Sequence, residues 1–187
     1  MLDIGCGAGR NAVPIAAGGW HVLGVDLSRP MLAAAAARAR NEQVADRCRV
    51  ALGSMDHLPV APRSCQLIVA HGIWNLARSA EEFRRGVHEA AGAAAVGAAL
   101  FVFTFSRSTL ADTAQPVAGE SFIFANLAGE RQVFVTGGQL LSELAAAGFV
   151  PDPALPLREI NPRKPGCLVA AGSPVIWEGA FRFTSTR

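Results

Sequence analysis

The chain has 187 residues, of which 51% are hydrophobic and 17% are charged, and its formal net charge is +2. This length suits one domain, expected over residues 1–187, and the composition is typical of a globular protein rather than a disordered one. Sixteen of the seventeen basic residues are arginines scattered along the chain. Because nucleic-acid binding needs a concentrated basic face, no nucleic-acid partner is expected.

The sequence gives no signal for a membrane, an export route or a metal. The longest uncharged run, Ala90–Ser106, is shorter than the roughly 20 residues that span a bilayer. No basic and apolar leader precedes Asp3, so the expected location is cytoplasmic. The cysteines form no CxxC pair, which predicts reduced, buried thiols rather than a zinc site or disulfides. These cysteines are Cys6, Cys48, Cys65 and Cys167.

The first hundred residues alternate strand and helix signals at the spacing of a parallel sheet built by crossover connections. Strands are expected over Met1–Gly5, Trp20–Asp26, Arg47–Gly53, Cys65–His71 and Ala98–Phe105. Helices are expected over Arg10–Ala17, over Met31–Arg40 and from Ser79 to about Ala95, with Ser28 as the cap of the second. The fold class is therefore α/β, with a doubly wound, mostly parallel sheet.

The last third of the chain departs from this alternation. Thr136 followed by Gln139 fits a capping box, and the helix that it opens is expected to stop at Gly148. Pro156–Asn161 and Pro174–Phe183 read as strands that pair antiparallel at one sheet edge, joined by the stretch NPRKPG. The preceding residues 106–135 carry no assignable pattern, and long loops of this kind are often functional.

A glycine-rich turn, LDIGCGAGRN, follows the first strand and opens the first helix. This arrangement presents backbone N–H groups and a helix N-terminus to a ligand. The dinucleotide fingerprint has glycine at its first, third and sixth positions, whereas the glycines here are Gly5, Gly7 and Gly9, and Arg10 holds the sixth position. The spacing therefore favours a ligand other than a dinucleotide, although the glycines could also serve only a tight turn.

Two acidic residues flank this turn. Asp3 lies two residues before the first glycine, where it would accept hydrogen bonds from an ammonium group and repel a pyrophosphate. Asp26 ends the next strand, where a carboxylate can hold both hydroxyls of a ribose. A cationic nucleoside fits this pair, and the alternative for Asp26 is the capping of the helix that follows it.

Residues 1–32 resemble the first two motifs of class I S-adenosylmethionine-dependent methyltransferases, most strongly in LDIGCGAG and GVDLS. The stretch GSMDHLPVAPRSCQLIVAHGIWNL is similar, more loosely, to the third and fourth motifs. The resemblance implies a Rossmann-like, mostly parallel seven-stranded sheet with an antiparallel strand pair at its C-terminal end. It also implies S-adenosylmethionine as cofactor. Relatives carry a helical segment before the first strand, so the chain is expected to be N-terminally short and its turnover weak.

The resemblance also assigns the methionine end of the cofactor. Gly5, Gly7 and the backbone around Cys6 would pack against the methionine part. Asp3 would face its amino group, directly or through water.

At the adenosine end the resemblance assigns Asp26 to the ribose diol and Leu27 to one face of the adenine. Ser54 stands where many relatives carry an Asp near the adenine amine, and a neutral acceptor is weaker than a charged one. Met55 would supply a backbone N–H and a soft contact to the ring. Asp56 is an adenine contact only if its loop shifts, and the alternative is a solvated loop residue.

Methyl transfer is an in-line displacement, so the protein mainly aligns the nucleophile with the methyl carbon. His71 ends the fourth strand and is the candidate catalytic base, and the alternative is that it packs against the methionine end of the cofactor. Trp74 either walls the acceptor pocket or fills the core. The Asn/Asp-Pro-Pro-aromatic tetrapeptide of DNA and protein amino methyltransferases is replaced by HGIW, which favours a small-molecule acceptor.

The unassigned residues 106–135 are the candidate cover of the acceptor, through Arg107, Phe122, Phe124 and Arg131. Two other functions stay open. One is a non-catalytic protein that keeps the fold. The other is an NAD(P)-dependent oxidoreductase, which is disfavoured by Arg10 and by the lack of any Tyr for a Tyr-Lys pair. The sequence does not indicate an oligomeric state.

Overall fold

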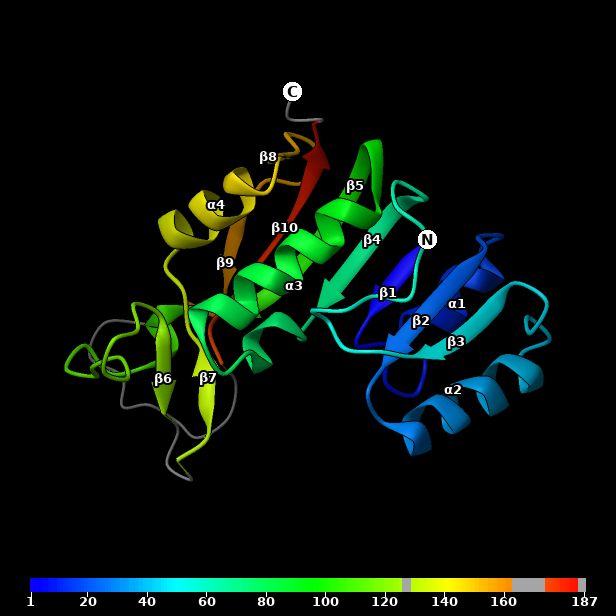
Figure 1. The fold of residues 1–187 in the computed structure, drawn as a ribbon, viewed down its shortest axis with the longest axis horizontal. Coiled ribbons are helices and arrows are strands. Elements are labelled where there is room, and N and C mark those ends of the chain that lie inside the picture. Colours follow the sequence, from blue (N-terminus) through cyan, green and yellow to red (C-terminus); the bar gives the residue numbers. More distant parts are fainter. Residues whose placement is uncertain (126–128, 163–173, 185–187) are drawn as a thin grey trace.

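The computed structural model describes residues 1–125, 129–162 and 174–184. Five parallel strands form most of its main sheet (Figure 1). They are β1 (Leu2–Ile4), β2 (Val22–Asp26), β3 (Cys48–Leu52), β4 (Cys65–His71) and β5 (Ala94–Phe105). Their order across the sheet is β3-β2-β1-β4-β5, so the chain reverses its winding direction between β1 and β4. In open α/β sheets, ligands bind outside the carboxyl ends of the strands at such a point.

The antiparallel end of the sheet lies beside β5. β10 (Ile176–Phe183) runs antiparallel to β5, and two short strands pair antiparallel with its other side. β8 (Phe149–Pro151) pairs with residues 181–183 and β9 (Arg158–Ile160) with residues 176–178. The predicted antiparallel pair is thus confirmed with shorter strands, while most of the NPRKPG connection lies outside the described residues. Because β8 and β9 share one edge of β10, the sheet is seven strands wide.

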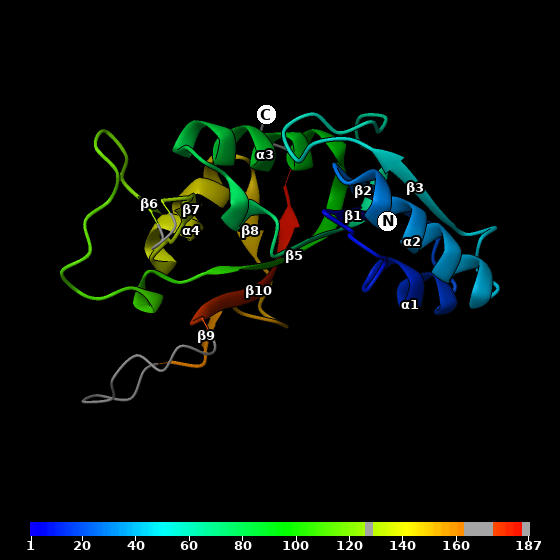
Figure 2. The ribbon, with the colours of Figure 1, turned by 90° about the horizontal axis from the view of Figure 1, so that it is seen from below.

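Helices cover both faces of the sheet. Figure 2 shows α3 (Ala80–Ala93) on one face and α1 (Ala12–Ala17) on the other. α2 (Arg29–Asn41) packs beside α1, and α4 (Gly137–Ala146) packs beside α3. None of the described helices has the length and apolar character needed to cross a membrane.

Each predicted cap is present. The Ser28 hydroxyl accepts a hydrogen bond from the Met31 N–H, and Thr136 forms the complete capping box with Gln139. Such caps satisfy backbone donors at a helix start that have no partner within the helix.

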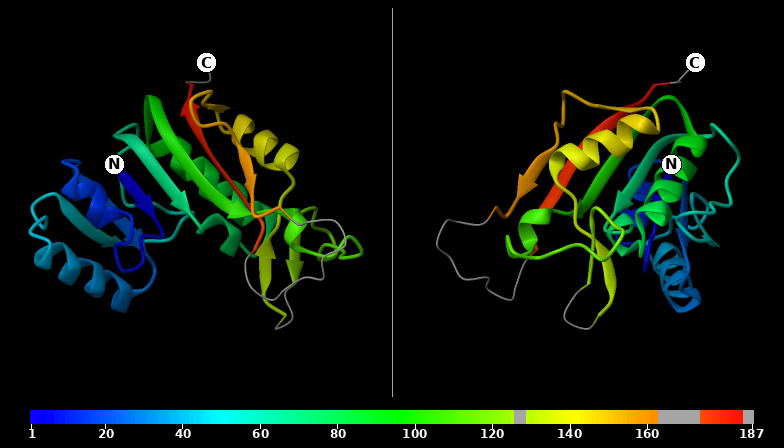
Figure 3. Two further views of the ribbon diagram at one scale, coloured as in Figure 1. Left: turned by 180° about the vertical axis from the view of Figure 1, so that it is seen from behind. Right: turned by 60° about the vertical axis from the view of Figure 1, so that its left-hand side comes forward.

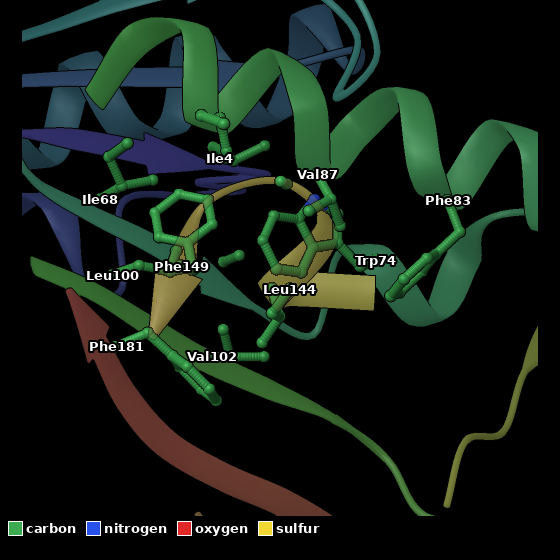
Figure 4. Packing of buried hydrophobic residues seen from close by; sticks show 14 of the residues in the cluster. Ile4, Ile68, Trp74, Phe83, Val87, Leu100, Val102, Leu144, Phe149 and Phe181 are labelled. Carbon is green, nitrogen blue, oxygen red and sulfur yellow. The ribbon is translucent and has the colours of Figure 1, made fainter. Parts of the chain in front are cut away.

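The larger hydrophobic core lies between the sheet and the pair α3 and α4 (Figure 4). Ile4, Ile68 and Leu100 of the sheet face Val87 of α3 and Leu144 of α4, and all are at most 1% exposed. A smaller cluster joins α1, α2 and the outer strands. The two clusters fix the strand ends on which the candidate site is built.

Several predicted boundaries are wrong. The helix expected from Arg10 begins at Ala12, because residues 7–11 form a turn in which Gly7 and Gly9 have φ values of +52° and +78°. β5 begins at Ala94 rather than Ala98, directly after α3. Gly97, with a φ of +78°, lies inside this strand near a register shift against β4. A glycine that reads as a turn in the sequence therefore marks a bulge.

The unassigned residues 106–135 contain a hairpin. β6 (Ile123–Ala125) pairs antiparallel with β7 (Arg131–Val133), and Figure 3 shows the pair beyond the end of β5, far from α1 and α2. A short 3-10 helix, η2 (Arg107–Thr109), precedes it, and a second, η1 (Trp74–Leu76), follows β4. Strands of three residues are too short for periodicity to predict.

Candidate functional site

A cavity of about 370 Å³ opens at the carboxyl ends of the parallel strands, beside the glycine turn. It brings together residues that the sequence places far apart. The predicted site residues in its lining are Gly5, Asp26, Leu27, Ser54, Met55 and Asp56. Such a volume lies within the range of small-molecule sites, about 300–1,000 Å³. The cavity therefore brings together all five residues predicted at the adenosine end, with Gly5 from the predicted methionine end.

Asp26 is held rigidly at the edge of this cavity. Its Oδ2 accepts a hydrogen bond from the Gly7 N–H at 2.9 Å, and its Oδ1 accepts one from the Ser28 N–H at 2.8 Å. A carboxylate offers about four acceptor positions, so each oxygen can accept a further hydrogen bond. The carboxylate thus ties the glycine turn to the second strand and still presents acceptors to a ligand.

Gly5 forms part of the cavity wall where the chain turns. Its N–H and that of Cys6 both donate to the Val25 carbonyl, at 2.7 and 3.0 Å. Its φ is +72°, and a Cβ at this position would lie 2.7–2.9 Å from the side chain of Ile73. Both the backbone conformation and the space therefore require glycine.

Asp3 lies under the glycine turn and outside the cavity lining. It is 1% exposed, and neither carboxylate oxygen has a hydrogen-bond partner. Burial raises the pKa of Asp3 from 3.8 to about 7, against the weaker opposing influence of the Ala12 N–H and the Asn11 side chain. Those two donors act electrostatically without reaching hydrogen-bond geometry. An unpartnered buried carboxyl is costly when ionised, so the group favours a bound cation or its own protonation.

Cys6 contributes its backbone to the turn but not its thiol to the cavity. The Sγ atom packs on Gly24 of β2, where an added Cβ would lie 2.7 Å from it. Burial raises the pKa of Cys6 to about 12. Cys48 and Cys65 are also free and buried, as predicted, and Cys167 lies outside the described residues. Within those residues, no group of three His, Cys, Asp or Glu side chains is placed to bind a metal.

Ser54 and Asp56 act together at the far end of the cavity. The Ser54 hydroxyl donates to Asp56 Oδ1 at 2.7 Å, and Arg85 approaches Oδ2 at 3.4 Å. The Ser54 hydrogen bond, followed by Arg85, holds the pKa of Asp56 below its ordinary value. Asp56 is therefore ionised at neutral pH. Because the serine proton is committed to Asp56, the Ser54 oxygen faces a ligand as an acceptor.

His71 does not line this cavity. It lies at the end of β4 in a second cavity, where Arg10 Nη2 is 3.0 Å from its Nδ1 and its ring stacks on Phe103 with centroids 4.3 Å apart. Burial, followed by the Arg10 charge, lowers the pKa of His71. Arginine has no acceptor, so Nδ1 accepts and the proton of the neutral ring is assigned to Nε2.

Several lining residues were missed by sequence reasoning. Ile73 and Leu76, from the segment after β4, and Val25 before Asp26 supply apolar walls. The signal for Ile73 and Leu76 was the stretch GIWNL, in which only Trp74 was considered. Trp74 is fully buried and fills the core.

Two of the four residues expected to cover the acceptor are buried. Phe122 and Phe124 are 1% and 4% exposed, and the Arg107 guanidinium lies 5.0 Å from the Phe124 ring centroid. Their roles in the described structure are packing roles. Arg131 does line a polar cleft that shares Leu27 with the cavity.

A family model described as "Methyltransferase domain" matches residues 1–97. The chain belongs to this family. A curated protein of Geobacillus sp. (strain WCH70), named only provisionally as a methyltransferase, is 54% identical over 44 residues. That match covers 24% of this chain and 18% of the relative, so the chain spans less than a fifth of its length.

Solved methyltransferase structures share the fold. An S-adenosylmethionine-dependent methyltransferase of Methanosarcina mazei has a TM-score of 0.75 at 20% identity, over 98% of this chain and 91% of that chain. The 1,6-didemethyltoxoflavin-N1-methyltransferase of Burkholderia thailandensis, with bound 1,6-didemethyltoxoflavin and S-adenosylhomocysteine, has a TM-score of 0.74 at 18% identity. It is matched over 98% of this chain and 70% of its own. These likenesses confirm the predicted fold class.

Proposed function

We propose that this chain binds S-adenosylmethionine in the cavity beside the glycine turn and transfers its methyl group to a small-molecule acceptor. The observation that carries the proposal is the Asp26 carboxylate, fixed by the Gly7 and Ser28 N–H groups at the cavity edge with acceptors to spare. The family of the chain supports the reaction class. The Burkholderia relative, which holds S-adenosylhomocysteine, supports the cofactor.

The residues at the adenosine end fit this cofactor. The spare acceptors of Asp26 suit a ribose diol, each hydroxyl donating one charge-assisted hydrogen bond. Leu27, 71% exposed, and the apolar Met55 and Ile73 provide faces for a planar base. The Ser54 oxygen, polarised by its bond to Asp56, is an acceptor for an exocyclic amine. This assigns Asp26, Leu27, Ser54 and Met55 to direct contact, and Asp56 to the support of Ser54.

The fit of the methionine end of the cofactor rests on a different observation, the environment of Asp3. Asp3 has two oxygens without partners under the turn, and an ammonium group nearby would favour its ionised form. Gly5 lines the cavity, and Cys6 and Gly7 follow it in the glycine turn. We assign these residues to the methionine part of the cofactor.

The cofactor, when bound, supplies an activated methyl group with its leaving group attached. The contribution of the chain is alignment and the exclusion of water from the line of attack. His71 was the candidate base. With Nδ1 accepting from Arg10 and the proton on Nε2, its neutral ring offers a donor at the end of β4. We therefore propose that His71 orients a bound group and does not remove a proton.

The small-molecule acceptor is proposed from the replacement of the amino-methyltransferase tetrapeptide by HGIW. The Burkholderia relative, which holds 1,6-didemethyltoxoflavin, supports it. We propose that the protein works in the cytoplasm, in keeping with the free thiols of Cys6, Cys48 and Cys65.

Titration calorimetry tests the cofactor. We expect saturable binding of S-adenosylhomocysteine and none of NADH, and Asp26→Ala should weaken the binding of S-adenosylhomocysteine at least a hundredfold. Binding of NADH without binding of S-adenosylhomocysteine would overturn the proposal. Transfer from labelled S-adenosylmethionine to a panel of small nucleophiles then separates an enzyme from a protein that only binds the cofactor.

A further inference from the structure

The loop after β3 carries residues proposed to contact the base, and one end of it is tied to the sheet. The Gly53 N–H donates to the Asp26 carbonyl at 3.2 Å. The His57 N–H donates to the Ser54 carbonyl, also at 3.2 Å, and closes residues 54–57 into a tight turn. These hydrogen bonds fix the start of the loop and its shape. The other end of the loop is held by α3.

Glu89 of α3 holds that other end. Its Oε2 accepts a hydrogen bond from the Leu58 N–H at 2.8 Å. Leu58 is buried, so its N–H needs an acceptor within the protein. A carboxylate is a stronger acceptor than a neutral group. The place of the loop against α3 therefore depends on the reach of the Glu89 side chain.

Two more residues of α3 lie against the same loop. Arg85, four residues before Glu89, approaches Asp56 Oδ2 at 3.4 Å. Gly86 lies three residues before Glu89, and positions three and four apart are neighbours on a helix surface. A Cβ at Gly86 would lie 3.5 Å from Met55 Cγ. α3 thus follows the loop closely, and the Glu89 hydrogen bond is shorter than the Arg85 contact.

The groups that this loop supplies at the cavity match one edge of adenine. Ser54 and Met55 both line the cavity. The Ser54 oxygen is an acceptor, because its proton is committed to Asp56. The Met55 N–H has no hydrogen-bond partner within the described residues and is an available donor. Adenine offers the complement, an amine donor beside the N1 acceptor, whereas hypoxanthine offers an oxygen beside a protonated N1.

We propose that Glu89 is a positioning residue for base recognition, and that its hold on Leu58 sets the preference of the cavity for adenine over hypoxanthine. Glu89 does not itself line the cavity, so it acts through the loop, by fixing where Ser54 and Met55 stand. The inference rests on the proposed function, because the base belongs to the cofactor proposed for this cavity. The hydrogen bond between α3 and the loop stands on its own geometry.

Two ligands that differ only at this edge of the base test the role. S-inosylhomocysteine is S-adenosylhomocysteine with hypoxanthine in place of adenine. By calorimetry we expect the wild type to bind S-adenosylhomocysteine at least tenfold more tightly, since hypoxanthine loses both hydrogen bonds. Glu89→Ala removes the acceptor and Glu89→Asp withdraws it by one methylene, so each should reduce the preference to threefold or less. Glu89→Gln keeps an oxygen at the same reach and should keep at least half of the preference.

Glu143→Ala is the matched control. Glu143 of α4 pairs with Arg84 of α3 at 2.7 Å, so this variant also removes a carboxylate that contacts α3, on the side that faces α4. It should keep the full preference for adenine. A loss in Glu143→Ala equal to that in Glu89→Ala would overturn the inference, because a general loosening of α3 would then explain both.

Hydrogen exchange of the backbone amides tests the tether without any ligand. Measured relative to the amides of β4, the Leu58 amide should exchange at least tenfold faster in Glu89→Ala and Glu89→Asp. The rates in Glu89→Gln and Glu143→Ala should stay near that of the wild type. Glu89→Asp carries both measurements if Glu89→Ala does not fold.

An unchanged Leu58 exchange rate in Glu89→Asp, or a wild type that binds both ligands equally, would overturn the inference. Binding of S-adenosylhomocysteine with a preference for adenine that is the same in Glu89→Asp rejects the inference and leaves the proposed function standing. A Leu58 amide that responds to Glu89 in a protein that binds neither ligand rejects the proposed function, and the role in base selection with it.

Discussion

Asp26 and Asp3 lie at the two ends of the candidate cofactor site, and the environments of their carboxylates are opposite. Asp26 accepts two backbone hydrogen bonds at the rim of the cavity. Asp3 is buried under the glycine turn with both oxygens unpartnered, and its pKa is raised to about 7. The proposed adenosine end is therefore built before any ligand arrives, whereas the proposed methionine end carries an electrostatic cost that a cation can relieve.

Position in the fold explains the difference. Asp26 ends β2, where the backbone N–H groups of two neighbouring turns converge on it. Asp3 lies within β1, whose own N–H groups are committed to β2 and β4, and α1 closes over it. The nearest donors, the Ala12 N–H and the Asn11 side chain, act on Asp3 without forming a hydrogen bond, so both carboxylate oxygens are left for a partner from elsewhere.

The largest effect on cofactor affinity is expected at the proposed adenosine end. Asp26→Ala removes the acceptors for two ribose hydroxyls, each worth about 1.5–3 kcal/mol when charge-assisted. We expect the affinity for S-adenosylhomocysteine to fall at least a hundredfold by calorimetry. Asp46→Asn, at a side chain that is 72% exposed, is the control. Retained affinity in Asp26→Ala would show that the two ends do not differ as described.

Asp3→Asn tests the opposite end. An acid whose pKa is higher in the folded protein costs stability as pH rises from its unfolded to its folded pKa, here between 3.8 and about 7. The cost above pH 7 is up to about 4 kcal/mol. Urea unfolding should show Asp3→Asn more stable than the wild type at pH 8 and about equal near pH 4. Cofactor affinity should fall in the same variant, and an unchanged pH profile would contradict the assignment.

Gly5→Ala tests the turn that separates the two carboxylates. The substitution forces a Cβ against Ile73 and places an alanine at a φ of +72°, at a cost of about 1–3 kcal/mol. Gly19→Ala is the matched control, because its φ is +97° but nothing lies within 4 Å of the added Cβ. The difference in the free energy of unfolding between the two variants isolates the contact with Ile73. Equal losses would mean that backbone strain alone requires the glycine.

The smallest effect is expected from Arg85→Met, which releases one partner of Asp56 at the adenosine end. The side chain of Arg85 is 49% exposed, and such ion pairs contribute about 0–1 kcal/mol. Affinity for S-adenosylhomocysteine should change by less than about fivefold. A larger loss would show that the adenosine end depends on this pair rather than on Asp26.

The parts of the fold that the sequence predicts are those with repeated local signals. The parallel strands, the caps at Ser28 and Thr136, and the β9–β10 pairing follow from apolar runs, hydroxyl caps and turn residues. The hairpin of β6 and β7 is not predictable in this way, because its three-residue strands carry no period and lack the glycine-rich motif that marks the equally short β1. β8 was missed for the same reason.

The site was predicted as a set of residue types but not as a geometry. The motif places Asp3 and Asp26 on either side of the glycine turn, yet no pattern in the sequence shows that one carboxylate is partnered and the other is not. The contact between Arg10 and His71 joins residues 61 positions apart. Such contacts depend on strand register, which forms only when the whole sheet does.

The alkylation rate of the Cys6 thiol reports how often the glycine turn opens. Its sulfur is 3.6 Å from the Gly7 carbonyl and packed on β2, so an alkylating reagent reaches it only when the turn opens. The rate of its modification in the native protein therefore measures how often the turn leaves its place. A ligand that fastens the turn through Asp26 slows that rate, even when it produces no heat or colour of its own.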